Sequence, residues 1–174
     1  MADLNGKNVA IIATNGFEDS ELTSPKEAVE SAGATTKVIS TETGEIEGKK
    51  GAKVAVDVKT ADASADEFDA LILPGGTVNA DTIRTDADAV ALVKAFKDAG
   101  KPIGVICHGG WILAEADVLK GVTLTSVANV KTDLANAGAN WVDEEVVVDS
   151  GFISSRTPDD LPAFNAALVE EFAK

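Results

Sequence analysis

Apolar runs and helix-like periodicities alternate along the chain. The run at residues 7–14 (KNVAIIAT) is almost continuously apolar, which is typical of a parallel strand buried on both faces. The pattern predicts strands at residues 7–14, 35–40, 70–73, 102–106, 122–124, 145–148 and 152–154, and helices at 25–33, 61–68, 86–99, 109–117, 132–137 and 161–172. Strands that alternate with helices predict an α/β fold with a doubly wound, mostly parallel sheet and right-handed crossovers.

Local signals fix the predicted ends of some elements. Ser24 is suited to cap a helix with Pro25 in its first turn, and Ser64 and Glu67 have the spacing of a capping box. Residues 41–60 interrupt the alternation with glycines and short alternating pieces. We expect a small antiparallel excursion there, at the edge of the sheet.

Composition narrows the class of protein. The 174 residues suffice for one domain, 1–174, with 45% hydrophobic and 25% charged residues. With 15 Lys and Arg against 29 Asp and Glu, the formal net charge is -14, which opposes binding to nucleic acids or anionic membranes.

The N-terminal segment and the cysteine count suggest a cellular setting. Residues 1–8 lack a basic region followed by an apolar run, and no stretch approaches the roughly 18 apolar residues of a membrane span. One cysteine forms neither an internal disulfide nor a thiolate metal cage. We therefore expect a reduced, cytoplasmic protein without a metal or cofactor.

The single cysteine is the strongest candidate for chemistry. Cys107 follows the predicted strand 102–106 and precedes Gly109 and Gly110, where a helix is expected to begin. A strand-to-helix corner exposes a side chain and places it near a helix N-terminus, which favours the reactive thiolate. The alternative is a buried cysteine that packs as a small hydrophobe.

Two neighbours of the thiol are candidates for moving protons. His108 is the only histidine, so a general base near neutral pH is either His108 or a carboxylate with a raised pKa. Adjacent side chains often point apart, so His108 could instead act only through its backbone N–H. Glu18, at the end of the first strand, could donate a hydrogen bond to a thiolate or shuttle protons, or could be a solvated turn acid.

A glycine loop follows the strand at 70–73. The amides of Gly75 and Gly76 could stabilise an oxyanion, or the pair could simply form a tight turn. The loop has neither a P-loop Lys-Ser/Thr nor GxGxxG spacing, so no nucleotide is predicted. Asp81 and Arg84, three residues apart, could form a surface salt bridge on one helix face.

Taken together, the motifs resemble a known family. Leu71–Gly76, Asp81–Arg84, Val105–Gly109 and Ser154–Phe164 are similar to the intracellular protease I (PfpI) branch of the ThiJ/PfpI superfamily, and so is the segment 127–148. The resemblance covers almost the whole chain. It implies a flavodoxin-like sandwich of the class I glutamine amidotransferase-like type.

The resemblance also implies roles for single residues. Cys107 would be the nucleophile, with an acid matching Glu18 hydrogen-bonded to its sulfur. The backbone amides of Gly76 and His108 would stabilise an oxyanion. The His108 side chain would pair with Asp81 of a neighbouring subunit, which implies a dimer or a larger homo-oligomer. The residues that would bind the substrate or its oxyanion are Gly75, Gly76 and Gly109.

Members of the superfamily are described as cysteine peptidases, as glyoxalases or deglycases, and as stress chaperones or oxidation sensors. The expectation for this chain is a cysteine-dependent stress-defence enzyme, either a hydrolase or a glyoxalase/deglycase. Its substrate would be a small carbonyl compound or a peptide. The alternative is an oxidation sensor or a chaperone without turnover.

Overall fold

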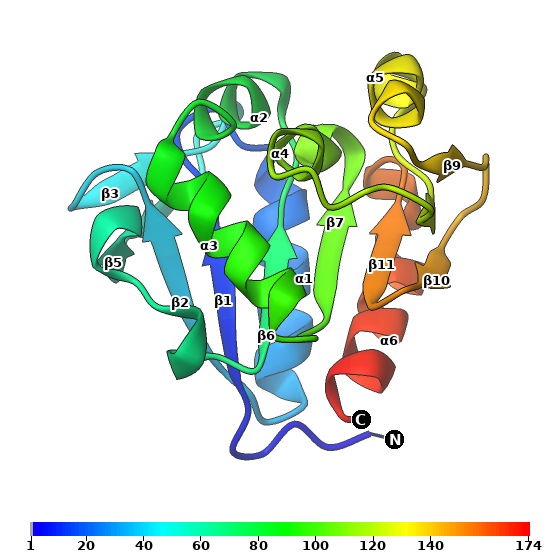
Figure 1. Cartoon of the computed structure of the whole chain (residues 1–174). Helices are drawn as coiled ribbons and strands as arrows, with labels where there is room; N and C mark the ends of the chain where they lie inside the picture. Colours follow the sequence, from blue (N-terminus) through cyan, green and yellow to red (C-terminus); the bar gives the residue numbers. More distant parts are fainter. Residues whose placement is uncertain (1) are drawn as a thin grey trace.

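A seven-stranded sheet forms the centre of the molecule (Figure 1). The computed structural model describes residues 2–174; Met1, the first residue of the predicted domain, lies outside the described residues. The strand order is β10-β11-β7-β6-β1-β2-β5, and every pairing is parallel except β10 with β11. The predicted doubly wound, flavodoxin-like α/β sheet is confirmed.

The strands follow the apolar runs. They are β1 (Asn8–Ile12), β2 (Thr35–Ser40), β5 (Val58–Lys59), β6 (Ala70–Leu73), β7 (Ile103–Ile106), β10 (Val147–Asp149) and β11 (Phe152–Ser155). Every residue of β6, β7 and β11 is buried, since helices cover both faces of the sheet. That is why these segments are continuously apolar rather than alternating.

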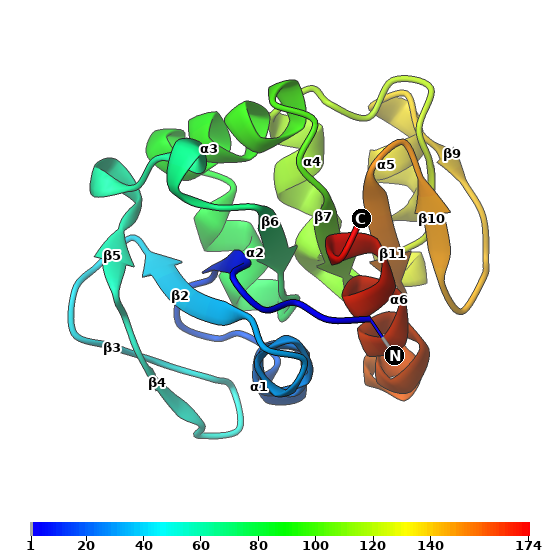
Figure 2. The same ribbon diagram turned by 90° about the horizontal axis from the view of Figure 1, so that it is seen from below.

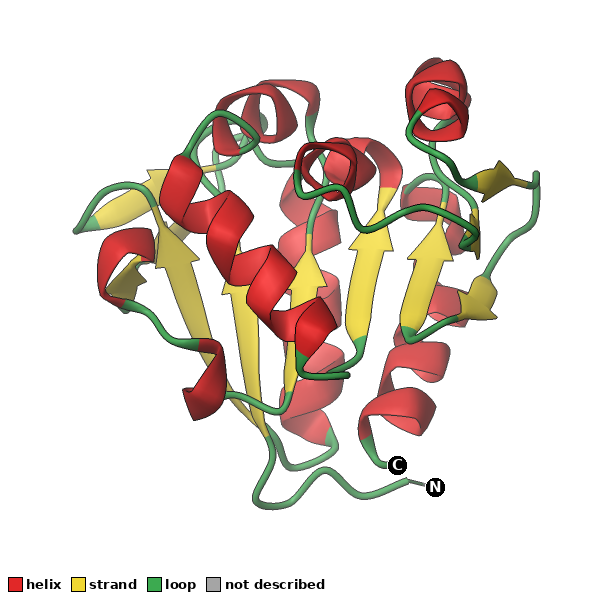
Figure 3. Cartoon of the chain, in the orientation of Figure 1, coloured by secondary structure: helices red, strands yellow, loops and turns green. Residues whose placement is uncertain are grey.

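Helices cover both faces (Figures 1 and 2). Helices α1 (Asp19–Ser31) and α6 (Leu161–Phe172) pack together on one face, and α3 (Ala87–Asp98) and α4 (Trp111–Glu115) lie on the other. Successive side chains of β1 alternate between two buried clusters, Val9 and Ile11 facing one and Ala10 and Ile12 the other. Helices α2 (Thr77–Ile83) and α5 (Lys131–Asn136) lie beyond the carboxyl ends of the strands, at the top of Figure 3.

Two small sheets complete the fold. Strands β3 (Glu45–Glu47) and β4 (Lys53–Ala55) form an antiparallel hairpin, which confirms the predicted excursion, while β5 instead joins the main sheet parallel to β2. The other small sheet pairs β8 (Thr123–Leu124) with β9 (Asn140–Trp141), a strand that the sequence pattern did not predict. No helix between residues 2 and 174 meets the length and hydrophobicity that a membrane crossing requires.

Two predicted helices differ in the structure. Helix α1 begins at Asp19 and contains Pro25 in its interior, so the predicted start at Ser24 is wrong. Pro25 lacks the N–H of a regular helix position, and it is among the buried residues of this helix. Residues 61–68 form two 3-10 turns rather than one helix, at Thr60–Asp62 and Ala65–Glu67.

Candidate active site

Three adjacent strands bring the predicted site residues together. Strand β6 lies between β1 and β7, so the segments that follow all three meet at one edge of the sheet. The backbone N–H of Glu18 donates to the Gly75 carbonyl at 3.2 Å, which joins the loop after β1 to the loop after β6. The segments that carry Glu18, Gly75 and Cys107 therefore lie close together at this edge of the sheet.

Cys107 stands on a strained elbow. Its φ is 60°, a left-handed conformation that few non-glycine residues adopt and that costs about 1–3 kcal/mol. The 3-10 turn Cys107–Gly110 begins here and leads into α4. The turn packs closely against the neighbouring strand end, because a Cβ on Gly109 would lie 2.6 Å from the Leu73 carbonyl oxygen. The thiol at the elbow is half-buried.

The carboxyl group beside the thiol belongs to Glu21, not to Glu18. Glu21 is fully buried, and its Oε1 accepts a hydrogen bond from Gly75 N–H at 3.0 Å. A Cβ on Gly75 would lie 2.8 Å from Cys107 Cβ and closer still to Glu21 Oε1, so the two side chains flank the same glycine. Within the described part of the chain, Glu21 Oε2 has no hydrogen-bond partner.

Glu18 turns to the other side of its loop. Its carboxylate is buried and forms ion pairs with the ammonium groups of Lys49 and Lys50. Burial works to raise the pKa of Glu18, but the hydrogen bonds from both lysines outweigh it and hold that pKa below its ordinary value. The expectation that Glu18 is bonded to the sulfur is therefore wrong, because the two lysines hold its carboxylate away.

Burial shifts the pKa of both groups at the thiol. It raises the pKa of Glu21 to about 7, and the neighbouring charge of Glu18 adds to the shift. It also raises the pKa of the Cys107 thiol to about 12, an effect that the charge of Glu21 reinforces and the amides of His108 and Gly76 oppose. The expected low pKa of Cys107 is wrong, because a short helix such as α4 has little dipole to set against burial beside a carboxylate.

Two backbone amides are directed at the sulfur of Cys107. The N–H groups of His108 and Gly76 hydrogen-bond to Cys107 and favour its charged form. The amide of Gly75 is already bonded to Glu21, so it is not an oxyanion donor as the sequence suggested. Gly76 has a φ of 91°, and a Cβ there would lie 2.5 Å from Glu18 N, so the tight packing of this loop requires glycine.

The imidazole of His108 bridges the thiol and α2. Its Nδ1 lies 3.3 Å from Cys107 Sγ, and its Nε2 lies 3.3 Å from Thr77 Oγ1. The ring also meets the edge of Trp111, with centroids 5.4 Å apart. Burial and the positive charge of Lys49 lower the pKa of His108, so the ring is neutral at pH 7. The side chain faces the thiol rather than pointing away from it.

Asp81 lies exposed on α2, the helix that also carries Thr77. Arg84 does not pair with it. Its guanidinium donates to Glu115 at 2.9 Å and lies over the Trp111 ring, 5.3 Å from the centroid. The predicted salt bridge between Asp81 and Arg84 is therefore wrong, because Arg84 reaches α4 instead.

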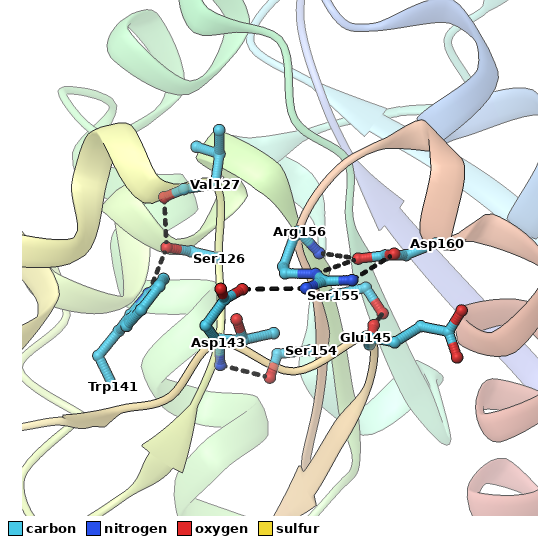
Figure 4. Close-up of polar contacts among 10 residues, drawn as sticks. Ser126, Val127, Trp141, Asp143, Glu145, Ser154, Ser155, Arg156 and Asp160 are labelled. Atoms are coloured by element: carbon cyan, nitrogen blue, oxygen red, sulfur yellow. Dashed lines mark hydrogen bonds and ion pairs between the residues drawn. The ribbon is translucent and has the colours of Figure 1, made fainter.

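The segment after β11 forms a separate polar cluster (Figure 4). Arg156 donates to the buried Asp160 through Nε at 2.9 Å and to the exposed Asp143 through Nη1 at 2.9 Å. These contacts give the tail motif a structural role, fixing the turn into α6.

Sequence reasoning missed Glu21, although the chain carries a signal for it. With Leu22, Pro25 and Val29, Glu21 belongs to the buried residues of α1. A carboxyl group at the buried positions of an amphipathic helix is unusual, and it becomes visible once the helix starts at Asp19. Among residues 2–174, no three or more His, Cys, Asp or Glu side chains are grouped so as to hold a metal ion.

The chain matches known proteins over nearly its whole length. Residues 7–171 match the model of the DJ-1/PfpI family. An uncharacterized protein of Staphylococcus saprophyticus is 53% identical over 168 residues, covering 95% of this chain and 97% of its own. One from Staphylococcus haemolyticus is 51% identical over the same shares of both chains.

Solved structures agree. A two-domain protein of Anabaena variabilis, with DJ-1/ThiJ/PfpI-like and ferritin-like domains, is 35% identical with a TM-score of 0.92; the match covers 94% of this chain and 47% of that one. A ThiJ/PfpI domain protein of Brachyspira murdochii is 29% identical, with a TM-score of 0.89 and coverage of 98% and 97%. DJ-1 of Schizosaccharomyces pombe, 22% identical with a TM-score of 0.85 and coverage of 94% and 90%, shares the fold.

Proposed function

The chain belongs to the DJ-1/PfpI family, and from this premise we propose that it is a cysteine-dependent enzyme of stress defence that acts on reactive carbonyl compounds. Family membership supports a stress-related, enzyme-like role. The finer proposal is a glyoxalase or deglycase reaction at Cys107, in the reducing cytoplasm. A hydrolase acting on peptides is the competing reaction.

One observation carries the proposal. The thiol of Cys107 is flanked by two groups that can exchange protons near neutral pH, the Glu21 carboxyl and the His108 ring. Two backbone amides, those of Gly76 and His108, are directed at the same sulfur. A nucleophile, bases and oxyanion donors thus meet at one point.

The first step removes the proton from the thiol. Because the pKa of Cys107 is raised, the sulfur attacks as its proton passes to a base, rather than as a preformed thiolate. Glu21, with a pKa of about 7, is a stronger base than His108, whose pKa is lowered. The sulfur forms a bond to the aldehyde carbon, and the amides of Gly76 and His108 stabilise the oxygen as it becomes negative.

The later steps follow from the same groups. The proton on Glu21 passes to this oxygen and gives a hemithioacetal. In a 2-oxoaldehyde, a base then moves the proton from the former aldehyde carbon to the neighbouring carbonyl carbon, while the hydroxyl proton passes to the oxygen of that neighbouring carbonyl. The product is a thioester of a 2-hydroxy acid. Water, deprotonated by His108, cleaves the thioester and restores the thiol. The balance is one 2-oxoaldehyde and one water to one 2-hydroxy acid, with no net oxidation.

The proposal also includes the branch of the family and the oligomeric state. The motif Val105–Gly109 and the tail Ser154–Phe164 support placement in the intracellular protease I branch. That branch pairs the histidine with an acid of a neighbouring subunit, and Asp81 is exposed on the helix that also carries Thr77, the partner of His108. We therefore propose a homo-oligomer in which Asp81 of one subunit meets His108 of another.

The test compares three variants on methylglyoxal, glycated amines and peptides. Cys107→Ser should abolish turnover of the preferred substrate. Glu21→Gln should lower kcat/KM by about 10²–10⁴-fold, the usual contribution of a general acid–base. Glu18→Gln, which removes the carboxylate paired with the lysines, serves as the matched control and should stay within about tenfold of the parent. Full activity in Cys107→Ser would rule out the nucleophile, and equal losses in the two glutamate variants would rule out the role of Glu21.

Oxidation sensing or chaperone action without turnover is the alternative. DJ-1 of Toxoplasma gondii has been solved in an oxidized form, although its 24% identity shows only a shared fold. A sensor would turn over none of the substrates, and mass spectrometry after graded peroxide would show stoichiometric oxidation of Cys107.

A further inference from the structure

The ring of His108 packs against a tryptophan to which the proposed reaction gives no role. Trp111 is the first residue of α4 and is half-buried. Its ring centroid lies 5.4 Å from that of His108, and the two planes are inclined by 70°, a T-shaped geometry that aromatic pairs favour. The imidazole also contacts Cys107 Sγ through Nδ1 and Thr77 Oγ1 through Nε2, each at 3.3 Å. The contact with Thr77 is longer than most hydrogen bonds and constrains the ring only weakly, so the packing against Trp111 is needed to orient it.

Trp111 is itself held by two other helices. Its indole N–H donates to Asp133 Oδ2 on α5 at 2.9 Å. The guanidinium of Arg84, at the end of α2, lies over the ring 5.3 Å from its centroid, within the range of a cation–π contact. Arg84 is fixed in turn, because its Nε and Nη2 donate to Glu115 Oε1 at 3.1 and 2.9 Å. Residues from three helices thus determine the orientation of one indole ring.

The helix that carries Asp133 is packed tightly onto the elbow. A Cβ on Gly110 would lie 3.1 Å from Leu134 Cδ1, and Leu134 is fully buried. Gly110 belongs to the same 3-10 turn as His108. The acceptor of the indole N–H is therefore fixed relative to the histidine.

The orientation of the imidazole decides what His108 can do. In a neutral ring one nitrogen donates and the other accepts a proton. Rotating the ring by half a turn would place the carbon Cδ2 where Nδ1 now lies, so Cys107 Sγ would meet a C–H group instead of a nitrogen. A ring that turned freely would spend part of its time unable to exchange protons at the site.

We infer that Trp111 is a positioning residue, which keeps the imidazole of His108 oriented with Nδ1 at the thiol, and that Asp133 holds Trp111 in place for this role. The inference rests on the proposed function for what His108 does in the reaction. Trp111 would exchange no proton itself and would act only through His108.

The single histidine makes the state of its ring directly measurable. In a neutral imidazole the protonated and the unprotonated nitrogen have well-separated nitrogen-15 chemical shifts, and interconversion of ring states averages them. At about pH 8 the ring is neutral, since the pKa of His108 is lowered. The parent should show two widely separated chemical shifts. Trp111→Leu should move them towards each other, to the values of a free imidazole.

The other tryptophan of the chain provides a matched control. Trp141 is also half-buried, its indole N–H donates to Ser126 Oγ at 2.9 Å (Figure 4), and the Lys131 ammonium lies 5.1 Å from its ring centroid. Trp141→Leu thus removes the same kinds of contact as Trp111→Leu, in the polar cluster after β11. It should leave both chemical shifts of His108 as in the parent.

A second pair of variants leaves Trp111 in the chain. Asp133→Ala removes the acceptor of the indole N–H and should move the chemical shifts in the same direction as Trp111→Leu, by a smaller amount. Asp133→Asn keeps an acceptor and should restore the parental values. Because the Asp133 side chain is exposed, these variants decide the question even if Trp111→Leu does not fold.

Kinetics separate action through His108 from contact with the substrate. Trp111→Leu should lower kcat about 10- to 100-fold, the scale expected for misplacing a catalytic group, with KM within about threefold of the parent. In a His108→Ala background the same substitution should lower kcat less than about threefold, because the group that it positions is already gone.

Parental chemical shifts in Trp111→Leu would overturn the inference, and so would parental values in Asp133→Ala or an equal change in Trp141→Leu. A full loss of kcat from Trp111→Leu in the His108→Ala background would show that Trp111 does not act through the histidine. Absence of turnover in the parent would count against the proposed enzyme, whereas the chemical shifts would still decide whether Trp111 orients the ring. The two failures are thereby distinguishable.

Discussion

A carboxyl group buried beside a thiol makes the stability of the protein depend on pH. The pKa of Glu21 is about 7 in the folded chain, against an ordinary value of 4.5. Between pH 4.5 and 7 the unfolded chain has released this proton and the folded chain has not, so the free energy of unfolding falls as pH rises. At about 1.4 kcal/mol per pKa unit, the loss across this window is about 3 kcal/mol.

Glu21→Gln should remove this loss, because glutamine does not titrate and its side-chain oxygen can still accept from Gly75 N–H. Urea unfolding of parent and variant at intervals from pH 4.5 to 7.5 measures it. His108, whose pKa is lowered in the folded chain, acts in the opposite direction, so the difference between the two proteins is the informative quantity. Parallel stability curves for the two proteins would contradict the raised pKa.

The sequence predicted the elbow that carries the thiol, but it did not predict which carboxyl group lies beside that thiol. The elbow at Cys107 was predictable, since an apolar strand followed by glycines leaves few conformations for the junction. The carboxyl group beside the thiol was not predictable, because Glu18 and Glu21 are three residues apart. Which of the two faces the thiol depends on where α1 starts. A start at Asp19 buries Glu21 with Leu22, whereas the expected start at Ser24 leaves both in a loop.

At the scale of elements, the tail after β11 supplies a test of how a polar cluster holds a helix in place. Asp160 is buried and accepts hydrogen bonds from Arg156 N, Nε and Nη2, at 2.9 to 3.0 Å (Figure 4). It stands directly before α6. Asp143 accepts from the same guanidinium, but its side chain is 70% exposed.

Asp160→Asn should therefore lower the free energy of unfolding by about 1.5–3 kcal/mol at pH 7, the range for buried hydrogen bonds to a charged group. The matched variant Asp143→Asn should cost less than about 1 kcal/mol, as exposed ion pairs do. Chemical denaturation of both variants measures the difference. Equal losses would show that burial of Asp160 does not determine the strength of the cluster.

The bounds of other helices and strands show where a local sequence pattern is enough to predict an element. Strands 35–40 and 70–73 and helix 161–172 were predicted with their observed bounds, because each is either a short apolar run or a long amphipathic repeat. The predicted helix 61–68 is two 3-10 turns instead. There the Ser64 hydroxyl accepts from Asp66 N–H at 3.3 Å, so the expected capping box with Glu67 does not form.

At the scale of the whole molecule, the alternation of strands and helices was enough to predict a doubly wound sheet. It was not enough to show where the segment 41–60 would dock. The hairpin is attached through backbone groups and the Asp19 carboxylate, and such contacts leave no periodic trace in the sequence. The ion pairs of Lys49 and Lys50 with Glu18 were therefore visible only in the structure.

The proposed pairing of Asp81 with His108 across subunits makes a prediction that only an assembly can fulfil. Cys107→Ser lacks the nucleophile and Asp81→Asn lacks the acid, so each variant alone should have little activity. In a mixed dimer, one site combines the intact Cys107 of one subunit with the intact Asp81 of the other. Random exchange places half of the subunit pairs in mixed dimers, each with one complete site of two, so roughly a quarter of the parental activity should return.

The experiment mixes the two purified variants under conditions that allow subunits to exchange, and follows activity and oligomeric state together. If Asp81 acted within its own subunit, a mixed dimer would contain no complete site. Mixing would then restore nothing, even though dimers form. Recovery of activity would instead show that the site is completed across an interface. In that case dilution below the dissociation constant should abolish turnover in the parent as well, because each lone subunit would retain its thiol but lose its partner acid.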